Sequence, residues 1–93
     1  VLVTHTHRDH APLASPFAER TGAPILAMQP PERQTHASGQ LDEDEDDDFA
    51  PDVVLTDGER IDGDGWTMTA LATPGHASNH MAFVLLEENA LFC

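Results

Sequence analysis

Residues 4–10 read THTHRDH, which places three imidazoles and one carboxylate within six consecutive positions of an acidic chain. The apolar run VLV at residues 1–3 precedes them and is typical of the end of a buried strand. His5 and His7 are two positions apart, and in extended backbone such side chains project from the same side. The stretch therefore predicts a metal site in preference to a solvated cluster of histidines.

Two further residues extend this motif. Asp9 continues the alternate row begun by His5 and His7, whereas His10 is displaced by one position and requires the backbone to turn first. The dipeptide Ala11-Pro12 follows and favours such a turn. Imidazole and carboxylate ligands together suit zinc, and iron or manganese are also possible.

Residues 5–10 resemble the H-x-H-x-D-H signature of the metallo-β-lactamase superfamily. The sequence TPGH at residues 73–76 resembles the segment that brings the next histidine ligand in that family. The resemblance implies an α/β fold that is part of a four-layer αββα sandwich, with mixed sheets and few helices. In such a sandwich the metals lie at one edge, between the two sheets.

The same resemblance implies a role for each ligand. The first metal would be held by His5, His7 and His76, and the second metal would use Asp9 and His10. A complete protein of this family would hold two zinc ions as its cofactor.

The family also uses a bridging aspartate in a Gly-Asp pair and a still later histidine, and the chain ends at Cys93 before either. We therefore expect residues 1–93 to be a partial metallo-β-lactamase-like domain. This fragment would begin inside one strand and stop one or two residues before the bridging ligand. Alone, it is expected to be inactive.

The ligand set suggests a metal-dependent hydrolase. Two zinc ions about 3.5–4 Å apart would share a water and convert it to hydroxide, which would attack a small ester, thioester, lactone or lactam. Asp9 would be the catalytic residue that also orients the hydroxide. Three alternatives stay open: a metal-dependent ribonuclease or phosphodiesterase, a mono-iron persulfide dioxygenase, and an inactive fragment that only binds metal.

Seventeen acidic residues against four arginines and no lysine give a formal charge of −13. This charge disfavours nucleic acid and anionic membrane as partners, so the expected partner is a small-molecule substrate. The oligomeric state stays open. A single cysteine excludes an internal disulfide, and no apolar run is long enough to span a bilayer, which leaves the cytoplasm as the default location.

Pattern and turn residues predict the order of the elements. We expect a short amphipathic helix packed on a sheet, a buried strand, a long acidic loop, short strands separated by turns, a half-buried strand that delivers His76, and a final hairpin. The ranges are 13–20 for the helix, 24–28 for the strand, 29–50 for the loop, 56–58 and 62–65 for turns, 66–73 for the half-buried strand, and 81–86 with 90–93 for the hairpin. The loop contains the acidic run at 42–48, predicted to be a flexible surface insertion.

Five other residues receive specific predictions. His80 is expected to be a structural histidine near the site but outside the ligands, and His36 an exposed loop residue. Trp66 is expected in the core and Cys93 in a strand. Gly75 is expected to let the backbone turn sharply ahead of the TPGH histidine.

Overall fold

The computed structural model describes residues 1–30, 46 and 48–93. These residues form one α-helix, one 3₁₀-helix and six strands. The helices are α1 (Ala14–Thr21) and η1 (Leu86–Glu88), and the strands are β1 (Leu26–Ala27), β2 (Val53–Val54), β3 (Arg60–Asp62), β4 (Thr67–Ala72), β5 (Met81–Leu85) and β6 (Ala90–Phe92). Within the described ranges, neither helix has the length and apolar character needed to cross a membrane.

Helix α1 starts and ends one residue later than predicted, and its end has the predicted cause. Gly22 adopts the left-handed conformation with φ 72°, and its N–H donates to the carbonyl of Ala18. The predicted packing face is wrong, because Leu13 is 79% and Phe17 is 58% exposed. Instead the small side chain of Ala14 is buried in the core, with Ala18 packed against that core. The apolar residues at helical spacing thus stay exposed and do not form the buried face of the helix.

Residues 1–3 run parallel to β1, and β1 runs parallel to β2. The N–H of Val3 donates to the carbonyl of Leu26 at 3.1 Å, and the N–H of Leu26 donates to the carbonyl of Val1 at 2.8 Å. Strand β1 is shorter than the predicted range 24–28, although Ile25 and Ala27 are both buried as predicted.

The unbroken apolar run at residues 1–3 is explained by burial on both faces of this parallel layer. Val3 belongs to the core cluster beneath α1, together with Ala27. Leu2 and Leu26 pack against the second core cluster, on the opposite face. Alternate residues therefore contact different layers, as strand geometry requires.

The second sheet is antiparallel, with strand order β3-β4-β5-β6. The predicted final hairpin is confirmed, with η1 in its connection and Asn89 in the left-handed region at φ 51°. Cys93 lies directly after β6 and not within a strand.

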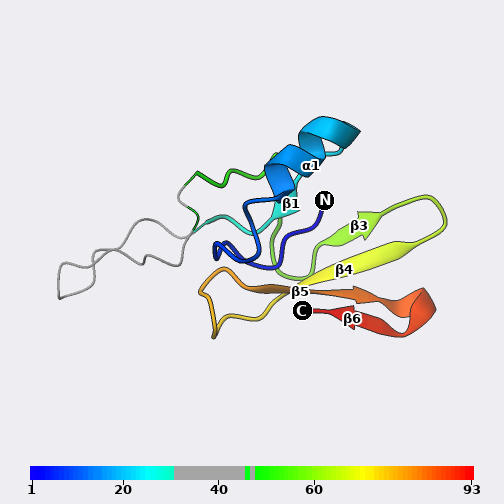
Figure 1. Cartoon of the computed structure of the whole chain (residues 1–93). Helices are drawn as coiled ribbons and strands as arrows, with labels where there is room; N and C mark the ends of the chain where they lie inside the picture. The colour runs from blue at the N-terminus through cyan, green and yellow to red at the C-terminus, as the bar shows by residue number, and fades with distance from the viewer. Residues whose placement is uncertain (31–45, 47) are drawn as a thin grey trace.

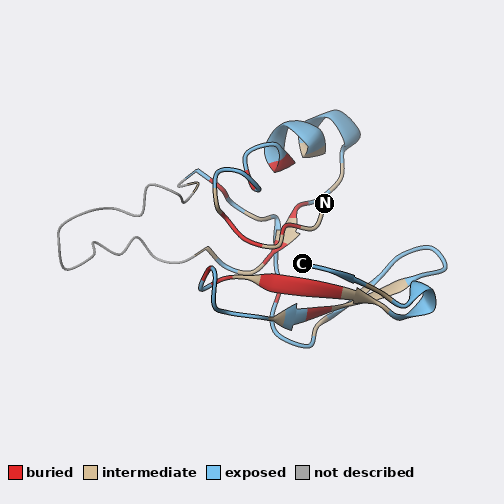
Figure 2. Cartoon of the chain, turned by 60° about the horizontal axis from the view of Figure 1, so that its bottom comes forward, coloured by how far each residue is buried: buried red, intermediate tan, exposed pale blue. Residues whose placement is uncertain are grey.

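Three layers follow from these contacts: α1, the parallel layer, and the four-stranded sheet (Figure 1). Phe49, close to the N-terminal end of β2, completes the cluster under α1. Met81 and Phe83 of β5 form the centre of the cluster between the two sheets. Figure 2 shows this burial along β5 and in the segments beneath α1. The layer order α, β, β corresponds to three of the four expected layers.

Trp66 and Gly75 also differ from their predictions. Trp66 is 40% exposed and is not a core residue. Its indole lies over Gly63, where a Cβ atom would overlap the ring. Gly75 has no positive φ, and a Cβ there would meet nothing within 4 Å, so the turn does not require glycine.

Most of the predicted loop at 29–50, with its acidic run and His36, lies outside the described residues. Its described residues, 29, 30, 46 and 48–50, form no helix or strand.

Candidate metal centre

Two segments far apart in the sequence meet at one edge of the two sheets. Residues 4–10 follow the first parallel segment, and residues 73–80 connect β4 to β5. The N–H of Met81, the first residue of β5, donates to the carbonyl of Thr4 at 2.7 Å. This backbone bond places the TPGH segment beside the THTHRDH segment.

Three predicted ligands from these segments converge. His5, His7 and His76, which we call the three-histidine group, offer nitrogen atoms that all lie within 4.8 Å of one another. His7 Nδ1 and His76 Nε2 are 3.2 Å apart although their residues are 69 positions apart in the chain. The structure therefore brings together the three histidines that were expected to share the first metal.

A second group forms within the local turn. His5, Asp9 and His10, which we call the turn group, offer ligand atoms within 4.8 Å of one another. The N–H groups of His10 and Ala11 both donate to the carbonyl of His7, at 2.9 and 3.0 Å. This is the turn that His10 was expected to need. The geometry differs from the expected allocation in one respect, since His5 belongs to both groups.

The environment of His5 suits a metal ligand. Its side chain is buried, and its Nδ1 lies 3.0 Å from the hydroxyl oxygen of Thr4. Its Nε2 is buried and has no hydrogen-bond partner among the described residues. A contact from Nδ1–H to Thr4 leaves a lone pair on Nε2, which is the arrangement that a metal-ligating imidazole uses.

The protonation of His5 fits the same role. Burial, and after it the neighbouring histidines beginning with His10, lowers the pKa of His5 to about 4. The imidazole is therefore neutral near pH 7, as metal binding requires. The buried nitrogen without a partner and the neutral ring both fit a divalent ion held by the three-histidine group.

His80 lies next to the site. Its ring centroid is 5.1 Å from that of His5, and its Nδ1 is 2.8 Å from the Thr73 hydroxyl. Burial, followed by His76 and His10, lowers the pKa of His80. It belongs to neither ligand group of the described chain. Its structural role stays a prediction, and this placement agrees with it.

Sequence reasoning missed the polar residues that surround the ligands. Thr4 contacts His5, and the Asn79 side-chain amide donates to the hydroxyl of Thr6 at 2.9 Å in a buried position. The alternation of threonine and histidine at residues 4–7 was the available signal, because the threonines occupy the row opposite the ligands. No comparable pattern marks Asn79.

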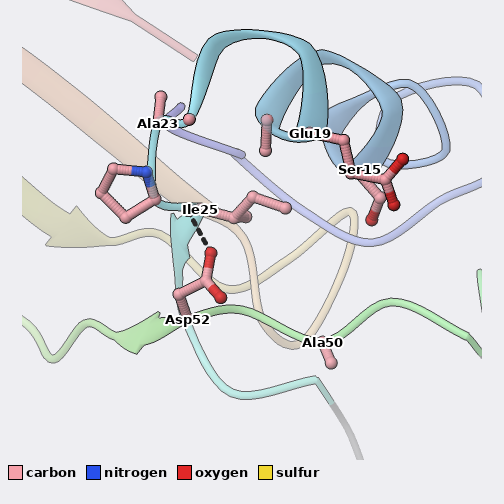
Figure 3. Close-up of a pocket in the computed structure, with 9 residues that line it drawn as sticks. Ser15, Glu19, Ala23, Ile25, Ala50 and Asp52 are labelled. Carbon is pink, nitrogen blue, oxygen red and sulfur yellow. Dashed lines mark hydrogen bonds between the residues drawn. The ribbon is translucent and has the colours of Figure 1, made fainter.

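Another hollow, of about 520 Å³, lies between α1 and the parallel layer (Figure 3). Ser15 and Glu19 of α1 and Asp52 contribute its polar side chains. Asp52 Oδ2 accepts a hydrogen bond from the N–H of Ile25 at 2.8 Å, so this carboxylate joins two backbone segments. No histidine lines this hollow.

Comparisons with known proteins identify the family of this chain. The sequence profile of the metallo-beta-lactamase superfamily matches residues 1–93. The lactamase-like protein adaB of Aspergillus niger is 36% identical over 95 residues, which cover 99% of this chain and 24% of adaB. The atrochrysone carboxyl ACP thioesterase of Aspergillus chevalieri is 36% identical over 91 residues, which cover 98% of this chain and 25% of the relative. The chain thus spans about a quarter of the length of these relatives.

A solved structure shows the same fold. The subclass B3 metallo-beta-lactamase BJP-1 of Bradyrhizobium japonicum superposes with a TM-score of 0.67 and 28% identity, covering 90% of this chain and 34% of BJP-1. The expected fold class, part of an αββα sandwich with mixed sheets and few helices, is therefore confirmed. On the profile match over its whole length, this chain belongs to the metallo-beta-lactamase superfamily.

Proposed function

We propose that the protein containing this chain is a metal-dependent hydrolase that acts on a small ester, thioester, lactone or lactam. One observation carries the proposal. Three histidine side chains from two segments converge in the three-histidine group, with ligand atoms within 4.8 Å of one another. Their convergence depends on the tertiary fold, whereas a surface cluster of histidines would need only neighbouring positions in the sequence.

We assign the ligands as follows. His5, His7 and His76 hold the first ion, and Asp9 and His10 belong to a second ion beside it. A bound divalent ion supplies Lewis acidity and lowers the pKa of a water molecule toward neutrality. Zinc is the ion that these ligand types suit best, with iron and manganese as alternatives.

The chain's own residues perform the remaining tasks in this proposal. The carboxylate of Asp9 is 80% exposed, so it can accept a hydrogen bond from the attacking water and orient it toward a substrate. Thr4 holds the His5 ring by its Nδ1 and thereby directs Nε2 into the site. No serine or cysteine nucleophile is needed for such a reaction.

The choice of substrate class rests on two supports. A relative with 36% identity over this region is named a carboxyl ACP thioesterase, which favours a thioester. The formal charge of −13 disfavours the polyanionic substrate of a nuclease. A small thioester is therefore the first substrate to test, followed by lactones.

The test is metal content and turnover of the full-length protein, purified without added metal. We expect elemental mass spectrometry to find about two zinc ions per chain. His76→Ala should lower both the zinc content and thioester hydrolysis. The matched control is His36→Ala, because His36 lies in neither ligand motif, and this variant should keep wild-type metal and turnover.

Other results would overturn the proposal in distinguishable ways. A single iron with oxygen consumption would indicate the persulfide dioxygenase alternative. Phosphodiester cleavage without thioester or lactone cleavage would indicate the nuclease alternative. Unchanged metal content in His76→Ala would show that the three-histidine group does not hold the metal.

A further inference from the structure

A buried side-chain hydrogen bond joins the two segments that carry the three-histidine group. Asn79 Nδ2 donates to Thr6 Oγ1 at 2.9 Å, between residues 73 positions apart. Thr6 is 0% and Asn79 is 4% exposed. Thr6 lies between two of the ligands, His5 and His7, and Asn79 lies three positions after His76. The bond therefore links the segment that carries His5 and His7 to the loop that carries His76.

The loop that carries Asn79 is held by its own backbone. The loop between β4 and β5 is closed at its base by a bond of 2.9 Å from the N–H of Thr73 to the carbonyl of His80. Within it, the N–H groups of Gly75 and His80 both donate to the carbonyl of Ala77. A displacement of Asn79 would therefore carry the rest of this short loop, His76 included, with it.

The amide of Asn79 is a costly group to bury at this place. Its Oδ1 is buried and has no hydrogen-bond partner among the described residues. An unpaired buried carbonyl oxygen destabilises a fold, and an apolar side chain of similar size would avoid this effect. The favourable contribution of Asn79 consequently lies in the directed bond from Nδ2.

We propose that Asn79 is a positioning residue that, through Thr6, sets the distance of His76 from His5 and His7. The inference rests on the proposed metal centre. It predicts that the bond contributes to metal affinity beyond any contribution to the stability of the fold.

The experiment is a double-mutant cycle in the full-length protein. The variants are Asn79→Leu, Thr6→Val, and the two combined. The zinc dissociation constant is measured by competition with a chromophoric chelator, and the Tm of the metal-free protein is measured in parallel. The spectrum of added cobalt(II) reports the ligand geometry of each variant.

We expect each single variant to bind zinc about tenfold more weakly, the lower end of the range for residues that orient metal ligands. The combined variant should bind zinc as weakly as the single ones, with an altered cobalt spectrum. Its Tm should nevertheless rise above that of Thr6→Val, because Thr6→Val leaves the buried amide of Asn79 without its acceptor and the combined variant removes that amide. The combined variant would then recover stability without recovering zinc affinity.

Two further variants serve as controls. Thr6→Ser keeps the hydroxyl acceptor and should restore zinc affinity to within about threefold of wild type. Thr67→Val removes another threonine hydroxyl bond, from Thr67 Oγ1 to Asp62 Oδ1 at 2.9 Å, at the far end of β4. This control should leave the zinc dissociation constant unchanged.

Wild-type zinc affinity in the combined variant would overturn the inference, because the bond would then serve the fold alone. The same conclusion would follow if Thr6→Ser bound zinc no better than Thr6→Val. If a single variant fails to fold, the combined variant decides, since it removes both partners of this bond. The variant His76→Ala distinguishes failure of this inference from failure of the proposed function. Unchanged zinc binding in His76→Ala would show that the proposed metal centre does not exist, whatever the role of Asn79.

Discussion

The three-histidine group and the turn group are built differently although they share His5. The three-histidine group combines side chains from two segments that are joined by β5 and by the buried bond between Asn79 and Thr6. The turn group comes from six consecutive residues, and its two remaining ligands, Asp9 and His10, have side chains that are 80% and 45% exposed. One group thus depends on tertiary packing, and the other on a local turn.

This difference has a consequence for how the two groups respond to change. In the three-histidine group His5 is buried, His7 is half-buried and His76 is exposed, whereas both other members of the turn group, Asp9 and His10, are exposed. A half-buried side chain such as His7 is restrained by the packing around it, whereas an exposed side chain can adopt other rotamers at little cost. We therefore expect the three-histidine group to be the tighter site and the turn group to be the weaker and more adaptable one.

The largest effect is expected from His5→Ala, which removes a ligand from both groups at once. Bound metal should fall from about two ions per chain toward none. Elemental mass spectrometry of the full-length protein measures it directly. Retention of both ions would show that the other ligands suffice without His5, and that the two groups do not depend on a shared histidine.

Asp9→Asn should have a smaller effect, confined to the turn group. Asparagine keeps the shape of the side chain but removes the negative charge that attracts a divalent ion to this ligand. We expect about one ion to remain per chain and thioester turnover to fall by at least about 100-fold. Loss of both ions would contradict the independence of the three-histidine group from the turn.

Local rules explain why the sequence could predict that His5, His7 and His10 come together. Alternation in extended backbone places His5 and His7 on one side, and Ala11-Pro12 marks the turn that allows His10 to join. Both are local rules. The helix end at Gly22 and the final hairpin follow from equally local signals, and both are confirmed.

What the sequence could not predict depends on packing between distant segments. Spacing of Leu13 and Phe17 indicates a helix but not that the side of Ala14 would face the core. Likewise, the bond between Asn79 and Thr6 exists only because the start of β5 lies beside residue 4. The shared membership of His5 combines both kinds of contact, since the three-histidine group needs His76 from a distant segment and the turn group needs only the local turn.

Burial of His5 also predicts a pH dependence of stability. Its pKa is lowered from 6.5 to about 4 in the folded chain, so the unfolded state binds a proton at a higher pH than the folded state. The free energy of unfolding of the metal-free protein should therefore fall as the pH is lowered from 6.5 to about 4, by at most about 3 kcal/mol.

Denaturant titrations of metal-free full-length protein at several pH values measure this loss. His5→Asn removes the buried imidazole and should flatten the profile in this pH window, although the lowered pKa of His80 leaves a residual slope of the same sign. An identical slope in the two proteins would show that His5 is not the group responsible. The exposed His10 offers the matched comparison, since His10→Asn should retain most of the slope.

The smallest effect is expected from Thr4→Val, which tests how firmly the shared ligand is oriented. The Thr4 hydroxyl lies 3.0 Å from Nδ1 of His5 and can accept a hydrogen bond from it, so the lone pair on Nε2 can bind the metal. Valine has nearly the same shape but cannot accept this hydrogen bond, which frees the ring to take the other tautomer. Zinc affinity should fall by about tenfold, in line with other partners of metal-bound histidines. Thr4→Ser keeps the hydroxyl and should bind zinc like the wild type.

Because His5 belongs to both groups, the loss in Thr4→Val should appear at both ions. A loss at only one ion would show which group fixes the orientation of the ring.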